Sequence, residues 1–201
     1  RIALEPHRKG DRPVPTDAPR NILIRAPNWV GDIVMATGNF ADVRRTFPGA
    51  RITVLLKPGR EKILEGSHDF DRVQFDRAGS SPAKLWRMAR ELRKERFDLA
   101  IIFPNSFRTA LVCYLAGIPR RAGYRRNLRS LFLTHGVDYE REPGGRRRPV
   151  PMPLFYAKLC EAAGVPRGDL KPRLVVTPEC EEKAMALHRV LGIADGEPLV
   201  G

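Results

Sequence analysis

An apolar run that passes directly into a helical pattern is the feature that most restricts how this chain can fold. The strand that it predicts covers residues 21–25, and the run ends in Pro27-Asn28. A Gly31-Asp32 pair follows, and apolar residues then recur every three or four positions. This order predicts a strand, a tight turn and a helix. Such a crossing is typical of an α/β sheet, where ligands bind beyond the carboxyl ends of the strands. Asp32 is therefore expected to be either a helix N-cap or a reactive base.

The same alternation continues along the chain. We expect strands near residues 51–56, 72–75, 99–103 and 121–124, and helices near 33–47, 61–64, 82–95, 107–116, 150–163 and 178–191. The continuous apolar run at 99–103 is typical of a strand that is buried on both faces. Strands that alternate with helices predict an α/β fold with a doubly wound, Rossmann-like parallel sheet and right-handed crossovers.

The two ends of the chain differ from its middle. Residues 1–20 are rich in proline and charge without any period, so we expect a flexible leader. Residues 21–172 carry the alternation and are predicted to form an amino-terminal Rossmann-like domain. Residues 173–201 are expected to form a linker helix, which starts at Thr177-Pro178, and the first strand of a truncated second domain.

Composition limits the kinds of protein this chain can be. The 201 residues are 42% hydrophobic, and no apolar run approaches the roughly 20 residues of a membrane helix. The proline-broken start lacks the apolar centre of a signal peptide, so we expect a cytoplasmic protein. Cys113, Cys160 and Cys180 lack metal-ligand spacing and are expected to be reduced thiols. The four histidines do not cluster, so no metal site is expected.

The chain is strongly basic. Its 36 Lys and Arg against 23 Asp and Glu give a net charge of +13. The arginines cluster at Arg120, Arg121, Arg125, Arg126 and Arg129, and again at Arg146, Arg147 and Arg148. Such charge indicates an anionic partner, which could be nucleic acid, a phosphorylated lipid or a nucleotide, or else a solvated arginine-rich surface.

The opening turn allows more than one chemistry. It lacks the three-glycine fingerprint and the Gly-Lys-Ser/Thr of phosphate loops, which argues against a dinucleotide-dependent oxidoreductase or epimerase. A carboxylate at a helix start is favoured in its ionised form and can take a proton from a hydroxyl. Asp32 could do this or could only cap its helix. Trp29 could stack on a sugar or belong to the core.

Four stretches carry a resemblance to one family. Residues 21–32, 103–111, 116–124 and 129–134 resemble, in the same order, the ADP-heptose:lipopolysaccharide heptosyltransferases, most closely the heptosyltransferase II group. The resemblance covers about residues 20–201. It implies the amino-terminal half of a GT-B glycosyltransferase, in which two Rossmann-like domains face each other across a cleft.

The resemblance also implies an activity. This is an inverting, metal-independent transfer of L-glycero-D-manno-heptose from ADP-heptose to the inner core of lipopolysaccharide, with Asp32 as the base and no cofactor. The family's donor site lies mostly in the second domain, so the 201-residue chain alone is expected to be inactive. Heptosyltransferase I or III, a related sugar transferase, and a basic nucleic-acid-binding domain remain alternatives, although no nucleic-acid-binding motif is present.

The implied acceptor is an anionic Kdo-containing lipid A glycolipid, at the cytoplasmic face of the inner membrane. Guanidinium groups suit its phosphates and carboxylates, and no nucleic-acid partner is then expected. The acceptor-binding candidates are Asn28, Trp29, Gly31, Asn105, Ser106, Arg108, Arg120, Arg121, Tyr124, Arg125 and Arg126, with Arg129 as a further one. Ser106 could instead only cap a helix, and each arginine could be solvated surface charge.

Overall fold

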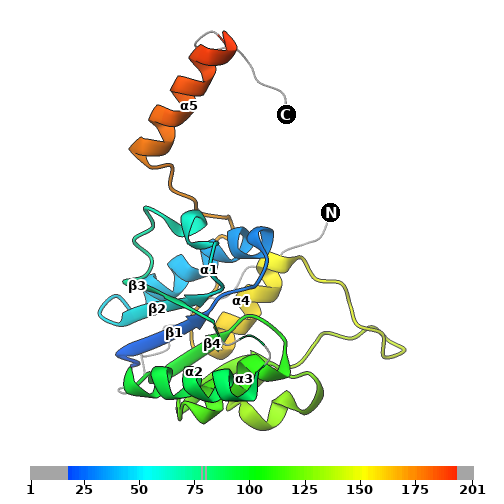
Figure 1. The fold of residues 1–201 in the computed structure, drawn as a ribbon. Coiled ribbons are helices and arrows are strands. Elements are labelled where there is room, and N and C mark those ends of the chain that lie inside the picture. The colour runs from blue at the N-terminus through cyan, green and yellow to red at the C-terminus, as the bar shows by residue number, and fades with distance from the viewer. Residues whose placement is uncertain (1–17, 78, 80, 194–201) are drawn as a thin grey trace.

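A single parallel sheet organises the chain. The computed structural model describes residues 18–77, 79 and 81–193. Its strands are β1 (Asn21–Arg25), β2 (Arg51–Leu56), β3 (Arg72–Phe75), β4 (Leu99–Ile102), β5 (Arg120–Tyr124) and β6 (His135–Val137). They pair in the order β3-β2-β1-β4-β5-β6, and every pair is parallel (Figure 1). This is the Rossmann order, so the expected α/β class is confirmed.

Helices cover both faces of this sheet. They are α1 (Val30–Thr46), α2 (Pro82–Lys94), α3 (Phe107–Leu115), α4 (Met152–Ala162) and α5 (Pro178–Leu191), with the short 3-10 helices η1 (Glu61–Leu64) and η2 (Asn127–Phe132). Ile22 and Ile24 of β1 pack in one core cluster with α1 and α4. Leu23 points the other way and joins the cluster of α2 and α3. This alternation is why residues 22–24, the centre of β1, are all apolar.

The predicted elements agree closely with the observed ones, with two exceptions. The short elements η2 and β6 were not predicted. The helix expected at 178–191 is confirmed, and the Thr177 hydroxyl accepts the Cys180 N–H as its cap. The leader predicted at residues 1–20 lies outside the described residues except for 18–20, and the strand predicted near 197–201 lies wholly outside them.

The segment that follows α4 runs back along α1. The Gly168 N–H donates to the Asp42 carboxylate (2.9 Å), and the Arg173 N–H donates to the Thr37 hydroxyl (2.7 Å). Between them the backbone of Lys171 lies so close to Gly38 that a side chain there would collide with it. The segment leads to α5, none of whose residues is buried and which extends away from the sheet in Figure 1.

Candidate active site at the carboxyl edge of the sheet

The strand order creates a crevice between β1 and β4. The chain leaves β1 for α1 on one face, and it leaves β4 for α3 on the other face. The two strands are paired up to Arg25 opposite Ile102. The loop at residues 26–29 and the loop at residues 103–106 therefore lie on either side of the switch point where ligands bind in such sheets.

Asp32 lies in the first turn of α1, at the mouth of this crevice. The N-cap is Trp29, which has an extended backbone and makes no side-chain cap bond. The alternative that Asp32 is the helix N-cap is therefore excluded, because Val30 and Gly31 already have helical conformations. A carboxylate in the first turn still gains from the helix dipole and the free N–H groups there. Asp32 is partly exposed and so is accessible to a ligand.

Tyr156 of α4 is the partner of Asp32, and sequence reasoning missed it. Its ring is buried and makes an edge contact with Phe103 at 5.1 Å between centroids. Burial raises the pKa of Tyr156, and the charge of Asp32 and a hydrogen bond to it raise it further. A phenol that stays neutral beside a carboxylate can donate its O–H to it. The pairing depends on α1 and α4 sharing one face, which no local pattern reveals.

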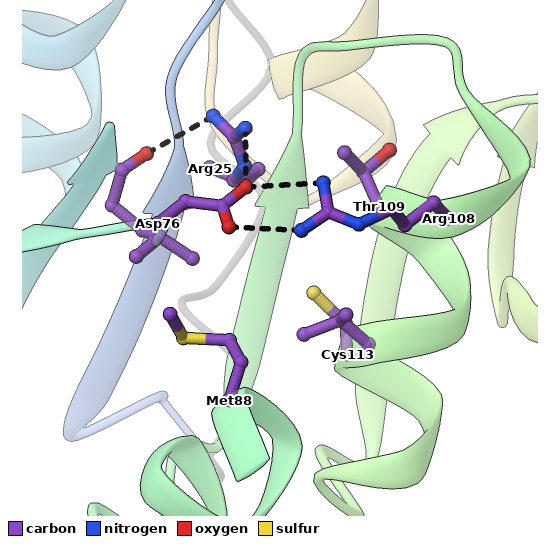
Figure 2. Close-up of a pocket in the computed structure, with 8 residues that line it drawn as sticks. Arg25, Asp76, Met88, Arg108, Thr109 and Cys113 are labelled. Carbon is purple, nitrogen blue, oxygen red and sulfur yellow. Dashed lines mark hydrogen bonds and ion pairs between the residues drawn. The ribbon is translucent and has the colours of Figure 1, made fainter. Parts of the chain in front are cut away.

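A buried ion-pair network underlies the same turn. Asp76, directly after β3, accepts from Arg25 at 3.0 Å and from Arg108 at 2.9 Å (Figure 2). The side chains of Arg25 and Asp76 are only 3% and 6% exposed. A cavity of about 10 Å³ lies beside the network and is lined in part by Met88 and Cys113. Burial raises the pKa of Cys113 to about 12, so this thiol stays protonated.

Arg25 also holds the turn that precedes Asp32. Its guanidinium donates to the backbone oxygens of Ala26 (2.6 Å) and Leu55 (3.3 Å) and to the Asn28 side chain (3.1 Å). Burial lowers the pKa of Arg25, and the Asp76 carboxylate opposes that shift. The network thus ties the loop before α1 to the first turn of α3, where Arg108 stands.

The other residues predicted near the turn have distinct environments. Trp29 is 74% exposed, which excludes the alternative that it belongs to the core. Gly31 is exposed, and no atom outside its neighbourhood would meet a side chain there. Ser106 is the N-cap of α3 and accepts the Thr109 N–H. Asn105 accepts from a guanidinium nitrogen of Arg129 at 3.4 Å.

The arginine cluster does not gather at one place. Arg120 and Arg121 begin β5, so they lie at the amino edge of the sheet, away from Asp32. Arg121 donates to the backbone oxygens of Phe132 and Ile118 and lies over the Tyr114 ring. Its guanidinium is therefore engaged in holding its own loop together.

The residues at and after the carboxyl end of β5 differ from Arg120 and Arg121 in their surroundings. Tyr124 is buried, stacks on Phe155 at 3.7 Å and donates its hydroxyl to the Phe155 backbone oxygen, so it is a core residue. Arg125 pairs with Asp138, and Arg126 is exposed. Arg129 is fully buried and donates to the Pro104 oxygen at 2.7 Å, which braces the loop after β4.

Two features are absent from the residues that the structure describes. No group of three His, Cys, Asp or Glu side chains there could hold a metal ion. In the same residues, no helix combines the length and the apolar character needed to cross a membrane.

The fold is shared with solved glycosyltransferases. The glycosyl transferase family 9 structure from Veillonella parvula superimposes with a TM-score of 0.73 at 18% identity, covering 89% of this chain and 51% of that one. The structure of Escherichia coli ADP-heptose lps heptosyltransferase II gives a TM-score of 0.64 at 24% identity, covering 89% and 52%. These likenesses show that the chain has the same Rossmann-like fold as the matched halves of these structures.

Sequence comparison gives the family. Lipopolysaccharide heptosyltransferase 2 of Escherichia coli K12 is 26% identical over 185 residues, and lipooligosaccharide heptosyltransferase 2 of Haemophilus ducreyi is 28% identical over 194 residues. Each match covers 90% of this chain and 52% of the relative. The model of glycosyltransferase family 9 (heptosyltransferase) matches residues 85–185, and the chain belongs to this family of enzymes. It spans about half the length of these curated relatives.

Proposed function

We propose that this chain supplies the acceptor-binding half of an enzyme that transfers L-glycero-D-manno-heptose from ADP-heptose to the inner core of lipopolysaccharide. The observation that carries the proposal is the position of Asp32. It stands in the first turn of a long helix, at the switch point of the sheet and beside the neutral Tyr156. The names of the heptosyltransferase 2 relatives support the substrate class. The donor is expected to bind mainly to a part of the enzyme beyond these 201 residues.

Asp32 would act as the general base. Its carboxylate takes the proton of the acceptor hydroxyl, whose oxygen forms a bond to the anomeric carbon of the heptose. The bond from that carbon to the ADP oxygen breaks, and ADP leaves with the electron pair. Attack from the face opposite ADP inverts the anomeric centre and requires neither a covalent intermediate nor a metal ion. The Tyr156 hydroxyl would hold the carboxylate toward the acceptor.

The acceptor would lie along the carboxyl edge of the sheet. Arg108, Arg125 and Arg126 follow strands β4 and β5 at this edge, whereas Arg120 and Arg121 lie at the opposite edge. We therefore assign the phosphate and carboxylate contacts of a Kdo-containing lipid A acceptor to Arg126 first, because it is exposed. Such an acceptor would place the enzyme at the cytoplasmic face of the inner membrane.

The test is a heptose-transfer assay with a protein that contains this chain and is as long as its curated relatives. Asp32→Asn should lower kcat by about 10²–10⁴-fold, the usual contribution of a general base. Tyr156→Phe should lower kcat less and leave KM nearly unchanged. Asp69→Asn, before β3 at the other edge of the sheet, is the matched control and should have no effect. An unaltered rate for Asp32→Asn would remove Asp32 from the chemistry.

Two further measurements test whether this chain acts alone and which transfer step the enzyme performs. The 201-residue chain alone should bind acceptor weakly and transfer no heptose, and transfer by it would refute the two-domain arrangement. A panel of acceptors that carry no, one or two heptoses distinguishes a heptosyltransferase II step from the alternative steps I and III. Only a preference for the acceptor with one heptose supports step II.

A further inference from the structure

Two leucines protrude together from η2. Leu128 and Leu131 are 70% and 75% exposed, which is unusual for large apolar side chains. In a 3-10 helix, side chains three positions apart lie above one another, since each turn takes three residues. The two leucines therefore form one apolar ridge on the outside of η2.

The ridge stands on a fixed support. Arg129, on the opposite side of η2, is fully buried and donates to the Pro104 oxygen. The Phe132 ring packs against Phe107 at 5.1 Å and against Tyr114 at 5.2 Å. Because its inner side is anchored in this way, η2 presents the two leucines outward without a partner in the described part of the chain.

Two arginines flank the start of the ridge, where η2 leaves the carboxyl end of β5. Arg125 and Arg126 directly precede η2, and Arg126 is exposed. The same edge of the sheet carries Asp32 and the exposed Trp29.

We propose that Leu128 and Leu131 insert into the headgroup region of an anionic lipid bilayer, with Arg126 bound to lipid phosphates. A protruding apolar ridge that begins beside the exposed Arg126 matches the two forces that hold proteins at such surfaces, apolar insertion and attraction to anionic lipid. Leucine is under-represented among the residues that dominate protein–protein interfaces, which favours lipid over a protein partner. This membrane-binding proposal depends on the proposed function in one respect, which is that a lipid-linked acceptor would bring the enzyme to a membrane.

Vesicle co-sedimentation of the 201-residue chain tests the ridge. The chain should bind vesicles of phosphatidylcholine with phosphatidylglycerol and should bind pure phosphatidylcholine much less. Leu128→Ser with Leu131→Ser should weaken binding about tenfold, and Arg126→Gln about fivefold. The matched control is Leu187→Ser with Val190→Ser, an exposed apolar pair of the same spacing on α5, which should bind like the wild type. Thermal melts should show that all variants fold.

Equal binding by the leucine variant and the wild type would overturn the proposal, and so would a lack of binding to anionic vesicles. A second readout does not depend on affinity. An environment-sensitive dye attached at Leu128→Cys, with Cys180→Ser to remove the exposed native thiol, should shift to the blue on vesicle binding. The same dye at Leu187→Cys should not shift, and a dye at position 128 that stays in water would refute insertion.

Transfer assays separate this proposal from the proposed function. In the full-length enzyme, the leucine variant should transfer heptose normally to a soluble, lipid-free acceptor and poorly to an acceptor embedded in vesicles. Equal losses on both acceptors would place the leucines in the catalytic site and refute a membrane role. If the wild type transfers heptose to neither acceptor, the proposed function fails, whereas the vesicle-binding results still decide the membrane role.

Discussion

Removing the charge of Asp76 should destabilise the fold more than removing any other single carboxylate described above. Asp76→Asn keeps the size of the side chain but leaves two guanidinium groups without their counter-ion. Arg25 is the more sensitive of the two, because its side chain is only 3% exposed and cannot turn to solvent. Arg108 is more exposed and can be rehydrated in part.

The size of the effect follows from burial. Breaking a buried ion pair by removing one partner costs about 3–5 kcal/mol. For a chain of this size that corresponds to a fall in Tm of about 6–20 °C. The matched control is Asp71→Asn at the other end of β3, where the pair with Arg44 lies nearer the surface, at 21% and 47% side-chain exposure, and the new amide oxygen can still accept the Ile52 N–H. Such surface pairs contribute about 0–1 kcal/mol.

Urea unfolding of wild type, Asp76→Asn and Asp71→Asn, followed by circular dichroism, measures the difference directly. The double variant Asp76→Asn with Arg25→Met should recover part of the lost stability, because it removes the uncompensated charge as well. Equal stability losses for Asp76→Asn and Asp71→Asn would refute the reasoning. A double variant no more stable than the single one would show that charge burial is not the cause.

Three further outcomes are expected. Gly38→Ala should destabilise the chain by about 1–3 kcal/mol and expose residues 168–173 to proteolysis, because the new methyl group meets the backbone of that segment. In Gly31→Ala, in the same helix, the new methyl group contacts no other residue, so this variant should stabilise the chain by about 0.5–1 kcal/mol. An equal loss of stability in Gly38→Ala and Gly31→Ala would contradict this reasoning. Burial raises the pKa of Glu95, but its pairs with Arg72 and Arg51 outweigh this and lower it. The stabilisation that ionised Glu95 gives the fold is therefore complete above the ordinary glutamate pKa and is lost as the pH falls through the lowered pKa of the folded state. The free energy of unfolding, measured with urea, should thus decline less below about pH 4.5 in Glu95→Gln than in the wild type.

The sequence pattern was enough to predict the central strands of the sheet but not its last strand, β6. Apolar runs located β1 and β4 to within a residue, because strands buried on both faces are mostly apolar. The three residues of β6 contain a histidine and a glycine, and they are a strand only because β5 pairs with them. No pattern of this length distinguishes such a strand from a loop.

The site was predictable where it is local in sequence and not where it depends on topology. The turn that carries Asp32 lies within one stretch and was found. The contact of Arg25 with Asp76 joins residues 51 positions apart and exists because β2 alone separates β1 from β3. In the sequence, Arg121 and Arg126 belong to the same run of arginines and cannot be told apart. In the structure, Arg121 donates to backbone oxygens, whereas Arg126 is exposed. Only the fold separates the two.

The segment after α4 has a mechanical consequence. It is fastened to α1 by the bonds at Thr37 and Asp42, which lie about 7.5 Å apart along the helix axis. Asp32 is on the same helix, little more than one turn before Thr37. A torque on α5 is therefore transmitted to α1, the helix that carries the Asp32 carboxylate, and also to the loop at Gly66, against which Val175 and Thr177 lie.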